Sequence, residues 1–288
     1  AITSKPARTA EAELVPSLLR EVAQLQREKA HDIAGAARTL RRAAQLHPDD
    51  VGLVRELCDV LTEAGDPAQA LAATGEILAA TQGQARIAIL RLRAELAAKG
   101  GDDAAAVTDL EEALTLGDKG ASPELAAALS RVVTRAAEQG RKAEARAAAL
   151  RLAEVLRAAG DHEQADQVLF RWIEAEPDDR EVLFKMRDIF TAAERWESAA
   201  NVWARLVHSE EEPEAKVQAV LAMTDACEKL GRGEEAIPWL SGVLGMVPGN
   251  RALQARLATL YAAAGNVVEA ARLRNVMADS EPDETERY

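Results

Sequence analysis

The chain has 288 residues, and its 35 Lys and Arg against 48 Asp and Glu give a formal charge of −13 at pH 7. Hydrophobic residues make up 48% of the sequence but aromatic residues only 3%, and alanine fills much of the difference. This composition disfavours β-sandwiches and barrels, which need β-branched and aromatic residues. The acidic charge disfavours binding to nucleic acids and to anionic membrane surfaces.

No stretch approaches the roughly 18 consecutive apolar residues of a transmembrane helix, so we expect no direct membrane insertion. Residues 1–12 are polar and lack the apolar stretch of a secretory signal. Cys58 and Cys227 each lie in an apolar helical pattern and are expected to be buried, free thiols. We therefore expect a cytoplasmic location.

Fifteen helices are predicted, joined by turns in which a glycine ends one helix and a polar residue caps the next. The steps from Gly231 to Gly265 and from Pro248 to Pro282 are both 34 residues. The predicted helices span 16–30, 32–47, 50–64, 67–81, 84–99, 102–116, 122–139, 141–159, 161–176, 178–193, 196–210, 213–230, 233–247, 250–264 and 266–280.

A small residue recurs shortly after each turn, and a larger apolar residue often follows four positions later. Small residues let two helices approach closely, and large ones fill the groove beside them. This spacing predicts antiparallel helix pairs that stack in register. The small residues are Ala36, Ala70, Ala106, Ala165, Ala199, Ala236 and Ala270, and the larger ones include Leu40, Leu110, Leu169, Trp203 and Leu240.

The pattern resembles the tetratricopeptide repeat, a helix-turn-helix unit of about 34 residues. The resemblance covers roughly residues 17–282, although Arg274 departs from it in the last unit. It implies an all-α, right-handed superhelical α-solenoid of about seven to eight helical hairpins that binds other proteins. The best-matched units contain Leu183, Met186, Phe190, Trp196, Ala199, Trp203 and Leu206, and Leu257, Ala258, Tyr261, Gly265, Ala270 and Pro282.

The repeats are interrupted near the middle of the chain, where Gly140 and Gly160 lie only 20 residues apart. Residues 122–159 either form one long helix kinked at Gly140 or belong to a unit with three helices. We expect a flexible N-terminal segment at 1–15, repeats at 16–121, irregular central helices at 122–160, further repeats at 161–282 and a flexible tail at 283–288.

No sequence motif for catalysis was found. The four histidines do not have the spacing of metal ligands, and nucleotide-binding and nucleophile motifs are absent from the sequence. The carboxylates are spread over helix faces that are expected to be solvated. We therefore expect no enzymatic activity, no cofactor and no metal site.

The resemblance also implies that the first helix of each pair lines a concave groove, which assigns inward positions by register. Aspartate stands where the family's clamp for a carboxylate has asparagine, which disfavours a C-terminal carboxylate as ligand. We expect a protein partner with an amphipathic segment carrying Lys or Arg, although ordinary solvated helix faces are the alternative. The candidate partner-binding residues are Arg55, Asp59, Leu90, Arg91, Phe184, Lys185, Asp188, Leu221, Asp225 and Arg256.

The sequence leaves alternatives open for Phe184 and for the last helix. Phe184 either anchors a partner or folds back onto Asp188 and the next helix as part of the core. The last helix still carries apolar residues such as Val267, Val268 and Val276, which indicates a longer array, cover by another protein, or self-association through this helix.

The predicted function is a non-enzymatic scaffold or adaptor. The alanine-rich composition suggests a bacterial source, and the resemblance there implies roles in secretion, pilus, motility or envelope assembly. The alternative is a regulatory or oligomerisation domain of a larger multidomain protein.

Overall fold

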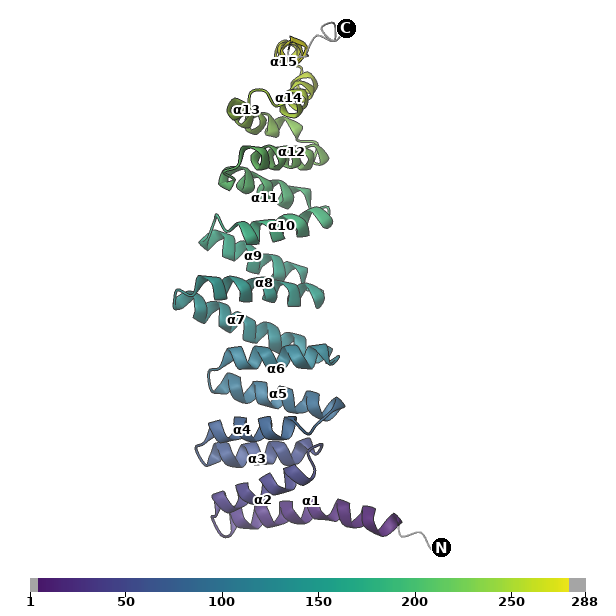
Figure 1. Ribbon diagram of the computed structural model, residues 1–288, viewed down its shortest axis with the longest axis vertical. Coiled ribbons are helices and arrows are strands. Elements are labelled where there is room, and N and C mark those ends of the chain that lie inside the picture. Colours follow the sequence, from purple (N-terminus) through teal and green to yellow (C-terminus); the bar gives the residue numbers. More distant parts are fainter. Residues whose placement is uncertain (1–4, 280–288) are drawn as a thin grey trace, which may run out of the picture. The chain divides into compact units, whose positions relative to one another are not determined.

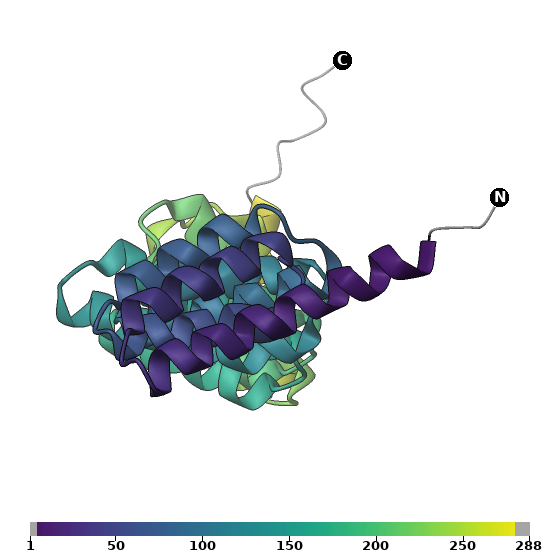
Figure 2. The same ribbon diagram turned by 90° about the horizontal axis from the view of Figure 1, so that it is seen from below.

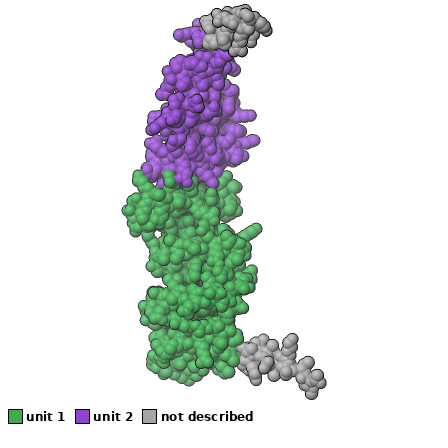
Figure 3. All heavy atoms as spheres, viewed as in Figure 1, with its two compact units in different colours: residues 1–165 green, residues 166–288 purple. Residues whose placement is uncertain are grey.

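The structure is a computed structural model that describes the backbone of residues 5–279 and the side chains of residues 15–278. Over that range the chain forms fifteen α-helices and two short 3-10 helices, with no β-strand. This confirms the predicted all-helical class and the predicted number of helices. The chain divides into two compact units, residues 1–165 and 166–288 (Figure 3), and none of the helices in 5–279 is long and apolar enough to cross a bilayer.

Unit 1 consists of helical hairpins that pack against one another in chain order (Figure 1). Helices α1 and α2, α3 and α4, α5 and α6, and α7 and α8 form the hairpins, and the second helix of each hairpin packs on the first helix of the next. The helices are α1 (Lys5–Glu28), α2 (Ile33–Leu46), α3 (Val51–Glu63), α4 (Pro67–Leu78), α5 (Gly83–Lys99), α6 (Asp103–Thr115), η1 (Lys119–Ala121), α7 (Ser122–Glu138) and α8 (Lys142–Ala158).

Unit 2 repeats this arrangement after helix α9, which contains the boundary between the units. Helices α10 and α11 form one hairpin, α12 and α13 the next, and α14 and α15 the last. The helices are α9 (His162–Ala175), α10 (Arg180–Ala192), α11 (Trp196–Ser209), α12 (Pro213–Lys229), η2 (Gly233–Ala236), α13 (Ile237–Met246), α14 (Arg251–Ala263) and α15 (Val267–Asp279).

In two hairpins of unit 1, glycine followed by aspartate makes the tight turn between the helices. Gly65 has a φ of 80°, a left-handed conformation in which a side chain is strained. Asp66 follows as the N-cap of α4, and its carboxylate accepts a hydrogen bond of 3.0 Å from the Gln69 backbone N–H. The same cap occurs at other helix starts, at Asp32, Asp50, Asp102, Asp161, Asp179 and Asn250.

Alanine recurs at fully buried positions in the helices. The seven alanines that recur after the turns are all at most 1% exposed, as the spacing predicted. Larger apolar residues fill the space beside them, and the largest fully buried side chain belongs to Phe190. Its ring stacks on Phe170 with 5.6 Å between the ring centres. The core of each unit is therefore a row of small-residue contacts separated by larger side chains.

Several acidic side chains are buried between helices, and each faces an arginine. Asp103 contacts Arg131 at 2.6 Å and Arg135 at 2.9 Å, both on α7. Asp109 accepts a hydrogen bond of 2.8 Å from Arg93 Nε. Asp166 binds Arg195 and Glu210 binds Arg180 in the same way in unit 2. Losing one member of such a pair leaves the other charge buried and uncompensated, so these pairs constrain which helices can be neighbours.

The structure differs from the sequence-based expectations at two places in the chain. Helix α1 begins at Lys5, so residues 5–15, expected to be flexible, are helical, in keeping with their Ala, Glu and Leu content. Residues 1–4 and the expected flexible tail at 283–288 lie outside the described residues.

Residues 122–159 form two helices, and the chain reverses direction between them at Gly140. There the Arg141 N–H donates a hydrogen bond of 2.8 Å to the Ala136 carbonyl. The kinked-helix alternative is therefore wrong, and α7 and α8 pack on each other as a hairpin.

The close contact at the recurring alanine predicts strong sensitivity to side-chain size. Ala70→Leu should lower the free energy of unfolding by about 1–3 kcal/mol, because the neighbouring helix must move away. Ala72 lies on the exposed side of the same helix, so Ala72→Leu should change it by less than about 0.5 kcal/mol. Urea unfolding followed by circular dichroism measures both, and equal effects would contradict the packing described.

One turn uses glutamate in place of glycine. Glu194 has a φ of 53°, and a non-glycine residue in this region costs about 1 kcal/mol or more. Glu194→Gly should therefore raise the urea midpoint of unit 2, while Glu197→Gly, within the first turn of α11, should lower it. A Glu194→Gly variant less stable than the parent would show that this side chain stabilises the turn.

Candidate partner-binding surface

The first helices of the hairpins in unit 1 are α1, α3, α5 and α7, and arginine–carboxylate pairs connect them. Arg20 on α1 contacts Glu56 on α3 at 2.8 Å, and Arg27 contacts Glu63 at 2.6 Å. Arg55 on α3 lies 3.5 Å from Glu95 on α5, and Arg91 on α5 binds Glu124 on α7. Each such pair is half exposed and is worth only about 0–1 kcal/mol by itself, so a charged partner can compete for these groups.

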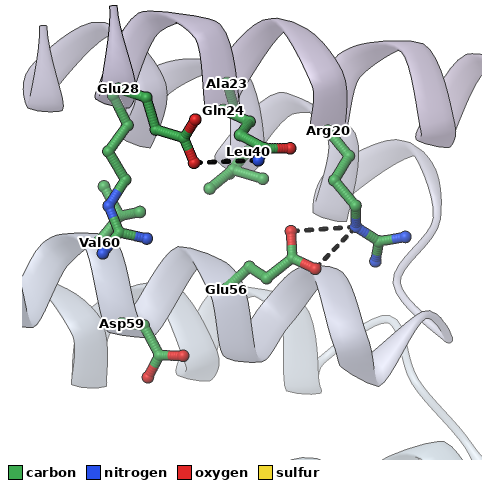
Figure 4. Close-up of a pocket in the computed structure, with 9 residues that line it drawn as sticks. Arg20, Ala23, Gln24, Glu28, Leu40, Glu56, Asp59 and Val60 are labelled. Carbon is green, nitrogen blue, oxygen red and sulfur yellow. Dashed lines mark hydrogen bonds and ion pairs between the residues drawn. The ribbon is translucent and has the colours of Figure 1, made fainter. Parts of the chain in front are cut away.

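A cavity of about 220 Å³ opens between α1 and α3 above Leu40 of α2 (Figure 4). Glu56 reaches across this cavity and accepts a hydrogen bond of 3.0 Å from Arg20 Nε. Asp59 also lines it and forms no ion pair with the described side chains. The cavity is small and its walls are mostly charged, so it suits a polar side chain rather than an apolar anchor.

Unit 2 has a wider and more apolar groove. It measures about 530 Å³ and lies between α10 and α12, with α11 as its floor. Trp196 and Trp203 are half-buried and contribute indole rings to that floor. The full lining consists of Thr191, Trp196, Ala199, Trp203, Ala222, Asp225, Ala226, Glu228 and Lys229. This arrangement gives an apolar floor with a charged rim, which is the surface best suited to an amphipathic segment.

The acids on the rim of this groove already have a cation. Arg256 on α14 contacts Glu228 at 2.8 Å and also binds Asp225. The sequence placed Asp225 and Arg256 in the candidate set separately, and the structure brings them together.

Phe184 is half-buried on α10 and is covered by two arginines. The guanidinium carbons of Arg180 and Arg187 lie 5.6 Å and 4.9 Å from the centre of its ring. Arg187 also lies 5.4 Å from the ring centre of Trp203 and forms an ion pair of 2.6 Å with Asp188. Phe184 is therefore not among the fully buried core residues. Arg187 connects Phe184, Asp188 and the groove floor.

The remaining candidates differ in exposure. Arg55 and Asp59 are exposed on α3, and Lys185 and Leu221 are half-buried on α10 and α12. Leu90 is fully buried, so it has no surface to offer a partner. Counted back from the left-handed glycine of each turn, Leu90 is equivalent to the buried Val54, and Arg91 to the exposed Arg55. The register assumed from the sequence was therefore shifted by one residue in α5.

Sequence reasoning missed the two tryptophans that form the groove floor. The family pattern marked both positions as core, and the half-burial of an aromatic ring depends on how neighbouring helices are spaced. The arginine–carboxylate pairs could have been predicted from the sequence, because charged residues recur at equivalent positions of successive repeats. Within residues 5–279, no group of three or more His, Cys, Asp or Glu is arranged to hold a metal ion.

These features define a helical-repeat protein built from stacked hairpins, with an exposed groove in unit 2 between two first helices and over a second helix. Two profiles described as tetratricopeptide repeat match the sequence, one at residues 28–96 and 228–288 and the other at 148–181. The matched segments cover more than half of the chain. The protein belongs to the tetratricopeptide repeat family, whose members are protein-interaction scaffolds.

The chain is also similar to several solved structures. A tetratricopeptide repeat protein from Parabacteroides merdae is 14% identical over 94% of this chain and 95% of its own, with a TM-score of 0.31. The P58(IPK) TPR domain is 16% identical over 93% and 94%, with a TM-score of 0.31. PilF from Pseudomonas aeruginosa is 13% identical over 85% and 97%, with a TM-score of 0.30. Scores this low carry no argument about function, and no curated protein matches the sequence.

Cys58, beside Asp59 on α3, gives a pH-dependent test of this packing. Burial, with a smaller effect of the Asp59 charge, raises the pKa of the Cys58 thiol from 9.0 to about 12. The folded state thus favours the protonated thiol, and this contribution to stability is present below pH 9 and is lost as the pH rises toward 12. In a Cys227→Ser background, disulfide reagents should label folded Cys58 at least about a hundredfold more slowly than the urea-unfolded chain. Equal rates would show that the thiol is accessible.

Proposed function

We propose that the protein is a non-enzymatic scaffold that binds a partner segment in the groove of unit 2. The observation that carries this proposal is the combination of an apolar floor with two half-buried indole rings and a rim of charged side chains. Aromatic side chains in partly desolvated grooves are the residues most often found to dominate binding energy. The first-helix face of unit 1, with Arg55, Asp59 and Arg91, supplies a second and more polar contact surface.

The chemistry of the rim favours a partner with an amphipathic segment that carries Lys or Arg. An apolar side chain of that segment would lie against Trp203, and its basic group would replace Arg256 at Asp225 and Glu228. Phe184, Lys185, Asp188 and Leu221 lie on the first helices beside the groove and would contact the flanks of the segment. Because one cation replaces another, affinity depends on salt only to the extent that the partner adds further charges.

A cytoplasmic adaptor in bacterial secretion, pilus, motility or envelope assembly is the setting we propose, and the alanine-rich composition supports a bacterial source. The alternative is a regulatory or oligomerisation domain of a larger protein, with self-association through the last helix. The exposed Val267, Val268 and Val276 on α15 favour this alternative.

The test is selection of peptides from a random library on the intact chain, followed by affinity measurements. Selected peptides should combine apolar residues with Lys or Arg. Trp203→Ala should weaken their binding about tenfold or more. Trp239→Ala, which removes an exposed tryptophan outside the groove, should leave it unchanged.

A second variant tests the exchange of cations at the rim. Arg256→Gln removes the internal guanidinium, so basic peptides should bind more tightly and with a stronger dependence on salt. Peptides in which Lys and Arg are replaced by Gln should lose this gain. Unchanged affinity for both Trp203→Ala and Arg256→Gln would place partner binding elsewhere on the molecule.

A further inference from the structure

One position of the repeat is occupied in helix α10 by a different kind of residue than in the other hairpins. The hairpins follow one another in regular order, and those of unit 1 lie one behind another in Figure 2. From α3 onward their turns close with the same hydrogen bond. The residue after the left-handed residue donates its N–H to a carbonyl five residues back, as Asp66 does to Leu61 and Arg195 to Phe190. Positions counted from the left-handed residue are therefore equivalent in these hairpins.

The position seven residues before the left-handed residue faces the second helix of the hairpin. In α3 it is Cys58, whose Sγ lies 4.0 Å from the carbonyl oxygen of Ala70, the recurring alanine of α4. In α10 it is Arg187, opposite the recurring Ala199 by the same register. The other hairpins have no residue longer than valine here, and all but Val133 are buried: Cys58, Ala94, Val133, Thr224 and Ala258.

A second exception lies in the same hairpin, nine residues after the left-handed residue. In α11 this residue is Trp203, which is only half-buried and forms part of the groove floor. In the last described helix, α15, it is the exposed Arg274. In α4, α6, α8 and α13 it is at most 3% exposed: Thr74, Leu110, Ala149 and Leu240.

The two exceptional residues lie against each other, with the guanidinium carbon of Arg187 5.4 Å from the centre of the indole. A charged group is rarely buried without a partner, and arginine reaches water by laying its aliphatic stem along apolar neighbours. The Arg187 guanidinium lies over the Phe184 ring at 4.9 Å and pairs at 2.6 Å with Asp188, which is exposed. A phenyl ring, an indole and a carboxylate therefore hold Arg187 in place.

Arg187 contacts the indole without forming part of the groove. Trp203 lines the groove, whereas Arg187 does not, so the guanidinium lies against the indole away from the floor surface. The stem of Arg187 begins at the position that faces the second helix, where the other hairpins have a short side chain. A short side chain at position 187 would leave room in the hairpin for an apolar ring.

We propose that Arg187 is a positioning residue, whose side chain keeps the indole of Trp203 at the floor of the groove in unit 2. With a short residue at position 187, the indole turns into the hairpin and is buried, as Leu110 and Leu240 are in theirs. This inference rests on the proposed function, in which the indole contacts the partner. It also implies a cost in stability, because a ring held half-exposed gives up apolar burial.

Fluorine NMR of the intact chain labelled with 5-fluorotryptophan tests the position of the ring. Trp203→Phe identifies the Trp203 resonance, and the shift of that resonance between H2O and D2O reports how exposed the ring is. Arg187→Ala should reduce this shift, while Arg187→Lys, which keeps a long cationic side chain, should preserve it. Arg205→Ala removes an exposed arginine of α11 outside the groove and should also preserve it.

Peptide binding and stability should change in opposite directions. Arg187→Ala should weaken the selected peptides about tenfold, as Trp203→Ala does. The two substitutions together should weaken them no more than Trp203→Ala alone, because both act through the same ring. Arg187→Ala should also raise the urea midpoint of unit 2, since the indole becomes buried. Arg187→Thr, which introduces the residue of α12, should behave in the same way.

Three outcomes would overturn the proposal. The Trp203 ring could be as exposed in Arg187→Ala as in the parent, or more so. Tighter peptide binding by Arg187→Ala would show that the arginine covers the indole instead of supporting it. Loss of folding in both Arg187→Ala and Arg187→Thr, seen by circular dichroism, would show that Arg187 stabilises the hairpin. If no peptide binds the groove, the proposed function fails, whereas the fluorine measurement needs no ligand and still decides this inference.

Discussion

The structure depends on the close approach of two helices at a recurring alanine. A larger side chain at that position would separate the helices, and the turn of only a few residues that joins them would no longer fit. Gly65 and Asp66 show how that turn is made, with a left-handed residue ending one helix and a carboxylate capping the next. A left-handed residue recurs in the turn of every hairpin, and together with the buried alanine it helps to set which side chains remain on the surface.

On the exposed faces of the helices, charged side chains make the contacts between hairpins. Arginine–carboxylate pairs join successive first helices, such as Arg20 with Glu56 and Arg256 with Glu228. These pairs lie on the surface that binds partners in the proposed function, so the protein's own side chains occupy the positions that a charged ligand needs. In that proposed function, specificity would rest on apolar contacts such as Trp203, while the charged rim would admit ligands that replace an arginine by another cation.

Local spacing made much of the fold predictable. The turn glycines and the alanines that follow them lie close together in sequence, and they fixed the helices and the hairpins. Features that depend on the distance between hairpins were not predictable in this way. Leu90 was assigned to the surface because the longer helix α5 shifted the register by one residue. Asp225 was expected to be available to a partner, because Arg256, which binds it, belongs to the next first helix.

Arg187 has a further consequence, because one guanidinium lies over both Phe184 on α10 and Trp203 on α11. In the proposed function, a ligand that displaces Arg187 from the indole would also remove one of the two guanidinium groups that lie over the phenyl ring. A ligand in the groove would in this way alter the surface of α10 beside it. A second protein that recognises the uncovered ring could distinguish loaded from empty scaffold.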